Sequence, residues 1–253
     1  MKKYELIKSD NSLYRVKALI DFGEICVGEI GGYVESESNL SQNGNAWISG
    51  NAKVSGHAVV TGNAKVSGDA WISGVAEVSG DARVTEHAEV TEHAEVVGTS
   101  LISGAAMVLG NARISGAAMV LGTSLISGAA KVTGNAEVSG VAVVCENAIV
   151  SGHAVVTGNA VVAEHAVVSG DAIIEHKGDI LIMHGFGSRN AIMGAYKEKN
   201  GVCIKCGCFT GTLSEFREKV LKTHSASENR LYKDEYLCII DLIKIHFGIN
   251  EEV

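Results

Sequence analysis

The chain has 253 residues, a formal net charge of −8 at pH 7, 30 glycines, 5% aromatic residues and no proline. This acidic balance argues against a nucleic-acid partner, because phosphate binding requires a basic surface. The sequence shows neither the apolar stretch of a secretion signal nor the run of about 18 apolar residues that a membrane span needs, so we expect a cytoplasmic protein. In that compartment the six cysteines are expected to be free thiols.

Residues 1–43 are predicted to form an N-terminal cap. Tyr4–Ile7 and Leu13–Val16 have the composition of short strands, and Asp10–Asn11 between them is a hairpin signal. This segment is expected to close the first end of the repeat that follows it.

Residues 44–175 consist of 22 consecutive hexads without insertion or deletion, beginning GNAWIS, GNAKVS, GHAVVT. The fifth position is Val or Ile in all 22 hexads, the third is Ala in 20, and the first is Gly in 18. Val34 and Leu40 continue the six-residue steps before Ala46. We therefore expect the repeat to start one coil before residue 44.

The alternation within each hexad predicts the fold. Positions three and five are two residues apart, so both face the same side of an extended strand. Val or Ile at position five suits a strand, constant Ala at position three indicates a tight inner corner, and Gly at position one lets the backbone bend. The fold class is therefore mainly β, a single-stranded β-helix of about seven coils and roughly 35 Å in length. Its edge strands require a cap at each end.

The segment Val54-Ser55-Gly56-His57-Ala58 keeps the aliphatic and the small residue through which the chain resembles the hexapeptide-repeat superfamily of left-handed β-helices. It departs from that pattern by placing Ser or Thr after the aliphatic residue and Gly one step later. The GNAxVS style, together with Cys208–Leu213, looks like the YdcK-like group of bacterial and phage β-helix proteins. A left-handed coil and a transferase-like fold are what the resemblance implies.

Residues 176–253 are predicted to form strands and a helical hairpin that packs on the rod. The expected strands are Asp179–Met183, Ala191–Tyr196 and Val202–Lys205. Thr212 and Glu215 have the capping-box pattern of a helix that runs to His224. Ser227 is the expected cap of a second helix, whose apolar stripe is formed by Leu237, Ile240, Ile243 and Phe247.

Position four points outward, and from Leu101 onward it is apolar in most hexads. The apolar residues at this position, which we predict to form an interface, are Leu101, Met107, Met119, Leu125, Val143, Ile149, Val155, Val161, Val167 and Ile173. Exposed apolar patches of this extent mark contact surfaces. Two coverings remain open, namely the chain's own C-terminal helices folded back over the rod and a neighbouring subunit.

Acyl transfer by a histidine base at a subunit interface is the activity that the resemblance implies. The histidines available in the repeat are His57, His87, His93, His153 and His165. All of them occupy position two, where Asn and Asp also occur, and this interchange indicates solvated corner residues. His93 is the candidate catalytic base, because the neighbouring Glu92 and Glu95 would raise its basicity.

Cys203-x-x-Cys206-x-Cys208 is the candidate metal cluster, with His184 and His224 as further ligands. A zinc ion there would hold the C-terminal cap to the rod. A second Cys-x-x-Cys is missing, however, and the alternation of Cys206 and Cys208 on a predicted strand favours structural thiols. We therefore expect no metal and no cofactor.

The sequence favours a non-enzymatic scaffold or binding protein that displays its β-helix surfaces to itself or to a partner. The loop-free repeat and the interchangeable histidines support this hypothesis. The alternative is a hexapeptide-type acyltransferase with a site between subunits, which would require a trimer. A third hypothesis is a protein that sequesters a small anionic ligand between subunits.

Overall fold

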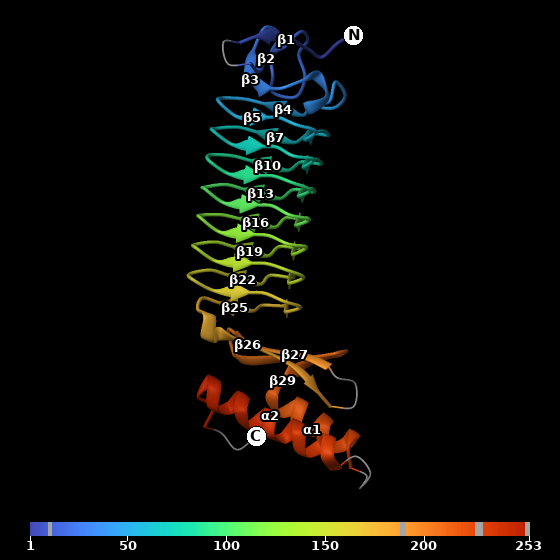
Figure 1. The fold of residues 1–253 in the computed structure, drawn as a ribbon, viewed down its shortest axis with the longest axis vertical. Helices are drawn as coiled ribbons and strands as arrows, with labels where there is room; N and C mark the ends of the chain where they lie inside the picture. The colour runs from blue at the N-terminus through green and yellow to red at the C-terminus, as the bar shows by residue number, and fades with distance from the viewer. Residues whose placement is uncertain (10–11, 188–190, 226–229, 251–253) are drawn as a thin grey trace.

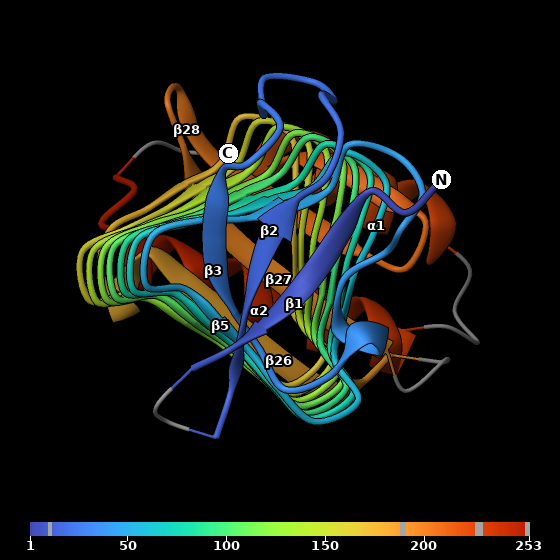
Figure 2. The same cartoon turned by 90° about the horizontal axis from the view of Figure 1, so that it is seen from above.

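The computed structural model describes residues 1–9, 12–187, 191–225 and 230–250, and it shows a rod of stacked coils with a cap at each end (Figure 1). The rod is a β-helix, as the six-residue period predicts, with the left-handed coil that the resemblance implies, and the 22 hexads supply one two-residue strand each. Viewed along its axis, the rod has a triangular outline, and its three sides are three parallel sheets (Figure 2).

We name each side of the rod after one exposed residue at position four. The Met107 face belongs to a ten-stranded sheet and contains β3 (Ile30–Val34), β5 (Lys53–Val54), β8 (Trp71–Ile72), β11 (Glu89–Val90), β14 (Met107–Val108), β17 (Leu125–Ile126), β20 (Val143–Val144) and β23 (Val161–Val162). The Arg113 face contains β6 (Val59–Val60), β9 (Glu77–Val78), β12 (Glu95–Val96), β15 (Arg113–Ile114), β18 (Lys131–Val132), β21 (Ile149–Val150) and β24 (Val167–Val168). The Arg83 face contains β4 (Trp47–Ile48), β7 (Lys65–Val66), β10 (Arg83–Val84), β13 (Leu101–Ile102), β16 (Met119–Val120), β19 (Glu137–Val138), β22 (Val155–Val156) and β25 (Ile173–Ile174).

The interior of the rod confirms the predicted roles of positions three and five. Every Ala at position three and every Val or Ile at position five is at most 1% exposed. The two exceptions at position three, Ser100 and Ser124, are equally buried, and their hydroxyls donate to the carbonyl oxygens of Val97 at 2.9 Å and Leu121 at 2.8 Å. A buried hydroxyl is tolerated there because its hydrogen bond is made within the turn.

The first coil begins before residue 44, as predicted, but in a different register. Val34 pairs with Val54 and Leu40 with Val60, so both stand at position five rather than at the Ala position. These partners are 20 residues apart, whereas Ile48 and its partner Val66 are 18 apart. The first coil therefore contains two extra residues between Leu40 and Ile48.

Two further strands close the N-terminal end of the rod. β1 (Tyr4–Lys8) pairs with β2 (Tyr14–Ala18), and β2 pairs with β3, both in the antiparallel sense. The three strands cross the open end of the triangle (Figure 2). The predicted hairpin strands are confirmed, and their turn at Asp10–Asn11 lies outside the described residues.

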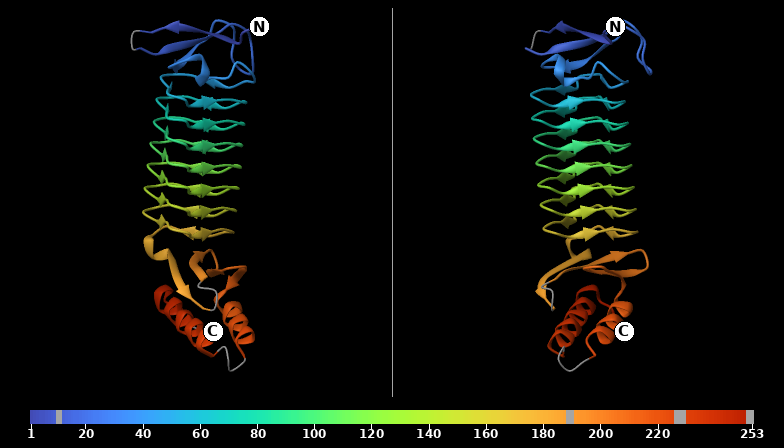
Figure 3. Two further views of the ribbon diagram at one scale, coloured as in Figure 1. Left: turned by 45° about the vertical axis from the view of Figure 1, so that its right-hand side comes forward. Right: turned by 90° about the vertical axis from the view of Figure 1, so that its right-hand side faces the viewer.

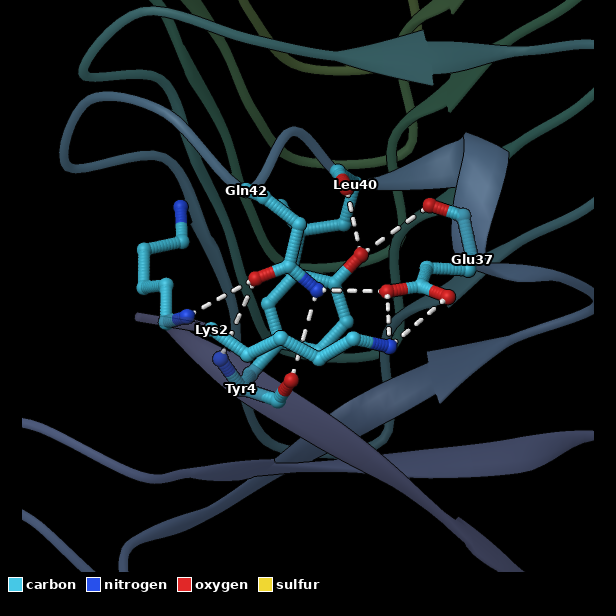
Figure 4. A network of polar contacts seen from close by, with 6 residues as sticks. Lys2, Tyr4, Glu37, Leu40 and Gln42 are labelled. Atoms are coloured by element: carbon cyan, nitrogen blue, oxygen red, sulfur yellow. Dashed lines mark hydrogen bonds and ion pairs between the residues drawn. The ribbon is translucent and has the colours of Figure 1, made fainter.

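A polar network fastens β1 to the first coil (Figure 4). The side-chain oxygen of Gln42 accepts the backbone N–H of Lys3 at 2.8 Å, and its amide donates to the carbonyl oxygen of Tyr4 at 3.3 Å and to the carboxylate of Glu37 at 2.8 Å. Lys2 forms an ion pair with the same carboxylate at 3.0 Å. Glu37 opens the short 3₁₀ helix η1 (Glu37–Asn39), which lies in the first coil.

The C-terminal end carries a four-stranded antiparallel sheet of β26 (Ile180–Phe186), β27 (Ala191–Glu198), β28 (Gly201–Cys206) and β29 (Phe209–Thr212), after the 3₁₀ helix η2 (Lys177–Asp179). Helices α1 (Leu213–Thr223) and α2 (Arg230–Phe247) follow. The capping box is confirmed, because Thr212 Oγ1 accepts the N–H of Glu215 and Glu215 accepts the N–H of Thr212 at 2.8 Å. The predicted second cap, Ser227, lies outside the described residues.

The two helices lie beyond the end of the rod, on the far side of this sheet (Figure 3). Ile240 and Ile243 of α2 pack with Met193 and Ile204 in a second hydrophobic core, whereas Tyr196 on the opposite side of the sheet belongs to the core of the rod. The first of the two coverings left open by the sequence, in which the helices fold back over the outer apolar residues, is therefore wrong, because the sheet already buries the apolar stripe of the helices. Neither helix in the described part of the chain is long and apolar enough to cross a bilayer.

Candidate functional site

Side chains at position two form polar ladders along the corners of the rod. The Asn51 amide donates to Asp69 at 3.1 Å, and the other carboxylate oxygen of Asp69 lies 3.6 Å from Nδ1 of His87 one coil further on. On another corner Asn135 and His153 are in contact at 3.2 Å. The side chains of His87 and His153 are 72% and 70% exposed. These histidines therefore stand in rows with amide and carboxylate side chains, in solvent.

His93, the candidate base, lines a shallow surface groove. His57, Val75 and His93 follow one another along one corner, and together with Glu92 they border a hollow of about 540 Å³. Glu95 forms an ion pair with Arg113 at 3.0 Å instead of supporting His93. Within the described residues no hydrogen bond or ion pair involves the imidazole. A second wall, from another molecule, is therefore needed before this histidine could hold a substrate.

The three clustered cysteines lie on β28 and the turn after it, and the sheet separates them. Cys203 belongs to the core of the rod and is 6% exposed, Cys206 packs against the helix-side core, and Cys208 is exposed. Burial raises the pKa of both the Cys203 and the Cys206 thiol. Of the proposed further ligands, His184 forms an ion pair with Glu164 and His224 stacks on Tyr236. In the part of the chain that the structure describes, no three side chains are arranged to hold a metal ion.

The Met107 face carries an uncharged block over four consecutive coils. We define the uncharged block as the outward residues at positions two, four and six, which are Ala105, Met107, Leu109, Thr123, Leu125, Ser127, Val141, Val143, Cys145, Asn159, Val161 and Ala163. Met107 is 40% exposed and Val141 is 59% exposed. The coil before the block is acidic, with Glu89 at position four and Glu86 and Glu92 at its two corners, and Glu146 and Glu164 stand at the corner beside the last two coils of the block. The block holds four of the ten predicted interface residues, Met107, Leu125, Val143 and Val161, in consecutive coils.

The other predicted interface residues are divided between the two remaining faces. Leu101, Met119, Val155 and Ile173 lie on the Arg83 face, and Ile149 and Val167 lie on the Arg113 face. Glu137 interrupts the first set, whereas the second is confined to the two last strands of its sheet. Of the ten residues, the structure therefore brings Met107, Leu125, Val143 and Val161 into one unbroken column.

A cavity of about 600 Å³ between the N-terminal cap and the Arg83 face was not anticipated from the sequence. Its floor is formed by Trp47, Lys65 and Arg83 at position four of three successive coils, and its wall by residues 23–29 of the cap. The recurrence of donor side chains at 18-residue intervals was visible in the sequence. The position of the cap segment over them depends on tertiary packing, with Phe22 edge-on to Trp47 at 5.4 Å.

The coils and their corner ladders define a β-helix rod built from six-residue repeats. No protein-family model matches the sequence, and no curated protein is significantly similar to it. Among solved structures, a proposed acetyltransferase of Bacillus cereus aligns with 81% of this chain and 92% of its own, at 9% sequence identity and a TM-score of 0.24. At these values the likeness carries no argument about activity, and the fold class rests on the coils themselves.

Proposed function

We propose that this protein is a non-enzymatic β-helix scaffold that associates with a second copy of itself through the Met107 face. The uncharged block carries the proposal, because twelve outward positions over four coils lack a charged side chain in a protein that is 20% charged overall. Covering Met107, Leu125 and Val143 removes apolar surface from water, which is worth about 25 cal/mol per Å². Patches of this kind on monomers are commonly contact sites.

The size of the uncharged block sets the strength of the contact. Four coils at about 4.8 Å and a strand segment of about 15 Å give roughly 300 Å² per subunit. Stable complexes bury about 800 Å² on each partner. The uncharged block alone is smaller than this, so the association is expected to be weak, with a dissociation constant in the micromolar range.

The charges beyond the block favour an antiparallel arrangement of the two rods. Glu86, Glu89 and Glu92 precede the block, whereas Lys177 is exposed directly after the last coil. Two rods running in the same direction would bring the acidic coils of both copies together. Rods running in opposite directions bring the acidic coil of one copy toward Lys177 of the other, and complementary charges of this kind fix register.

The test is the solution mass, measured by size-exclusion chromatography with light scattering over about 1 to 200 μM protein. We expect a monomer at the lowest concentration and a rising dimer fraction above it. Leu125→Lys should abolish the rise, because a charge would be buried at the centre of the contact. Ile149→Lys is the matched control, since Ile149 has the same position four on the Arg113 face.

A monomeric mass at every concentration would contradict the proposal. Equal loss of association in Leu125→Lys and Ile149→Lys would also contradict it, because it would assign the contact to another part of the rod. A cross-link between cysteines placed at residues 89 and 177 of different copies distinguishes the antiparallel from the parallel arrangement.

A hexapeptide-type acyltransferase is the second candidate, and the groove of His57, Val75, Glu92 and His93 favours it. In that function a neighbouring subunit would supply the second wall, and His93 would accept a proton from the acceptor group of a substrate. The test combines a thermal shift with acetyl-CoA and an assay of CoA release, with His87→Ala as control for His93→Ala. Release that both variants leave unchanged would exclude His93 as the base.

The cellular setting and the nearest relatives belong to the same proposal. All six cysteines are free thiols, which favours a reducing compartment and therefore the cytoplasm. The GNAxVS hexads and the segment Cys208–Leu213 support a relationship to the YdcK-like group.

A further inference from the structure

The cavity above the Arg83 face has the size of a small-molecule site. Its volume of about 600 Å³ falls within the range of ligand pockets, roughly 300 to 1,000 Å³. Trp47, Lys65 and Arg83 are register partners in successive coils, so their side chains form a column with a spacing of about 4.8 Å. All three side chains are hydrogen-bond donors and none is an acceptor.

Two members of this column have unused donor capacity. Trp47 is 3% exposed, and its Nε1 is buried without a hydrogen-bond partner among the described residues. Such an orphaned donor is uncommon in a folded protein, and because the atom itself is buried it lies beneath the surface of the cavity. The exposed guanidinium of Arg83 makes no hydrogen bond or ion pair in the described part of the chain, although Arg presents five donors in a planar fork.

The third member, Lys65, shows what kind of group the column accepts. The carboxylate of Glu24, from the cap segment that forms the cavity wall, is ion-paired with Lys65. The hydrogen bond and the charge of Lys65 lower the pKa of Glu24, and the nearby charge of Arg83 contributes in the same direction. A carboxylate oxygen therefore already occupies one place in the column.

The walls of the cavity limit the charge and composition of a ligand. Glu29 and Asp81 contribute two further carboxylates, which disfavour a compact polyanion but accept hydrogen bonds from hydroxyl groups. Ser49, Ser67 and Asn63 add donors and acceptors of the kind that bind hydroxyls. The lining thus combines two cations, Lys65 and Arg83, with three carboxylates and with neutral polar groups, and Arg83 is the cation without a partner among the described residues.

We infer that this cavity binds a small polyhydroxylated anion, in which a carboxylate or phosphate group lies against Arg83 and Lys65 and the hydroxyls face the polar wall. The site is complete within one chain and does not depend on self-association. Glu24 competes for Lys65 with the anionic group of the ligand. Removal of Glu24 is therefore expected to tighten binding, whereas removal of Arg83 weakens it.

The experiment is isothermal titration calorimetry of the full chain at low ionic strength, where screening is weak. The probes are glucose 6-phosphate and glucuronate. Glucose, which carries only the hydroxyls, and inorganic phosphate, which carries only the anionic group, are the comparison ligands. Arg83→Gln should weaken binding of both sugar anions by at least about tenfold, since a charge-assisted bidentate contact is lost. Glu24→Gln should tighten it by several-fold, and Arg113→Gln, on the Arg113 face, should leave it unchanged.

Each outcome decides the inference. Saturable binding of either sugar anion with the opposite responses of Arg83→Gln and Glu24→Gln supports it, and the preferred probe identifies the anionic group. Binding of inorganic phosphate as tight as that of glucose 6-phosphate would overturn the role of the hydroxyls. Absence of saturable binding up to about 10 mM, or equal affinity in Arg83→Gln, would overturn the site itself. Unchanged far-UV circular dichroism and thermal midpoints of the variants confirm that they are folded.

Discussion

The side-chain amide of Asn39 donates a hydrogen bond to the carbonyl oxygen of Ala58 at 2.9 Å. In the regular coils the carbonyl oxygen at position three accepts instead from the backbone N–H at position four of the preceding coil, as Ala64 does from Trp47 at 3.0 Å. The amide of Asn39 therefore replaces a backbone donor that no preceding coil supplies. The same amide also donates to the carbonyl oxygen of Gly56 at 3.0 Å. Lys3 acts similarly at a second corner, where its Nζ lies 2.9 Å from the carbonyl oxygen of Ala46. Single side chains thus complete the exposed edge of the first coil.

Asn39→Ala is predicted to destabilise the rod by about 2 to 4 kcal/mol. Two carbonyl oxygens would lose their donors at once, and each buried unpaired group costs about 1 to 3 kcal/mol. Urea denaturation followed by circular dichroism measures the change. Asn43→Ala is the control, because Asn43 is exposed in the same segment and, among the residues that the structure describes, only its backbone is hydrogen-bonded. Equal midpoints for the two variants would show that Asn39 does not cap the coil.

The coils could be predicted from the sequence because each hexad repeats the same local constraint. Val or Ile at position five and Ala at position three are buried wherever they occur, so all 22 hexads predict the same local structure. The caps are different, since Asn39 acts on Gly56 and Ala58 across 17 and 19 residues, and no pattern marks that distance. The two-residue insertion after Leu40 was missed because hexad spacing alone does not distinguish position three from position five.

The candidate site was less predictable than the fold. The sequence gives the outward residue of each hexad, and the three-hexad coil assigns Met107, Leu125, Val143 and Val161 to one face. It does not reveal what covers an apolar stripe, and so the helices were wrongly expected on the rod. β29 (Phe209–Thr212), too short to be recognised, completes the sheet that receives them. The cavity at Arg83 could not be predicted, because one of its walls is a cap segment that lies outside the repeat and whose path the sequence pattern does not specify.

Asp179→Asn is predicted to destabilise the protein at pH 7 by about 1 to 3 kcal/mol. Asp179 is 4% exposed, accepts the N–H groups of Glu175 at 3.0 Å and His176 at 2.8 Å, and is ion-paired with Lys197. Burial acts to raise the pKa of Asp179, but these hydrogen bonds and the Lys197 charge outweigh it, so that the pKa lies below its ordinary value.

The sign of the pH dependence follows from that shift. A carboxyl group with a depressed pKa in the folded state stabilises the fold above the unfolded pKa of about 3.9, and this contribution is lost as the pH falls through the folded value. The wild type should therefore lose stability below about pH 4 more steeply than Asp179→Asn. Asp171→Asn, at an exposed carboxylate, should follow the wild type at every pH. Parallel curves for wild type and Asp179→Asn would contradict the assignment.

Gly110→Ala is predicted to destabilise the rod by about 1 to 2 kcal/mol, because Gly110 has φ +76° and L residues are strained in that region. An added Cβ would also lie 2.7 Å from the carbonyl oxygen of Gly128. Glu92, at the same position of an earlier hexad, has φ +61°, so Glu92→Gly should leave stability unchanged or raise it by up to about 1 kcal/mol. Urea midpoints measure both variants, and a loss of stability in Glu92→Gly would refute the argument from backbone strain.

The six thiols are predicted to react with a thiol-specific disulfide reagent in two classes at pH 8. Cys26, Cys208 and Cys238 are exposed and should react first. The remaining thiols are Cys145, Cys203 and Cys206, and burial raises the pKa of each. A smaller fraction of each is therefore in the reactive thiolate form, and they should react at least about tenfold more slowly. Cys203 should be the slowest, because it lies between the sheet and the last coil and reacts only when the two separate. Stopped-flow absorbance measures how many thiols react in each class, and loss of the slowest phase in Cys203→Ser would assign that phase to Cys203. Unfolded protein, in which all six thiols should react at the same rate, provides the control. Reaction of Cys203 in the fast class would mean that the sheet does not stay closed over the end of the rod in solution.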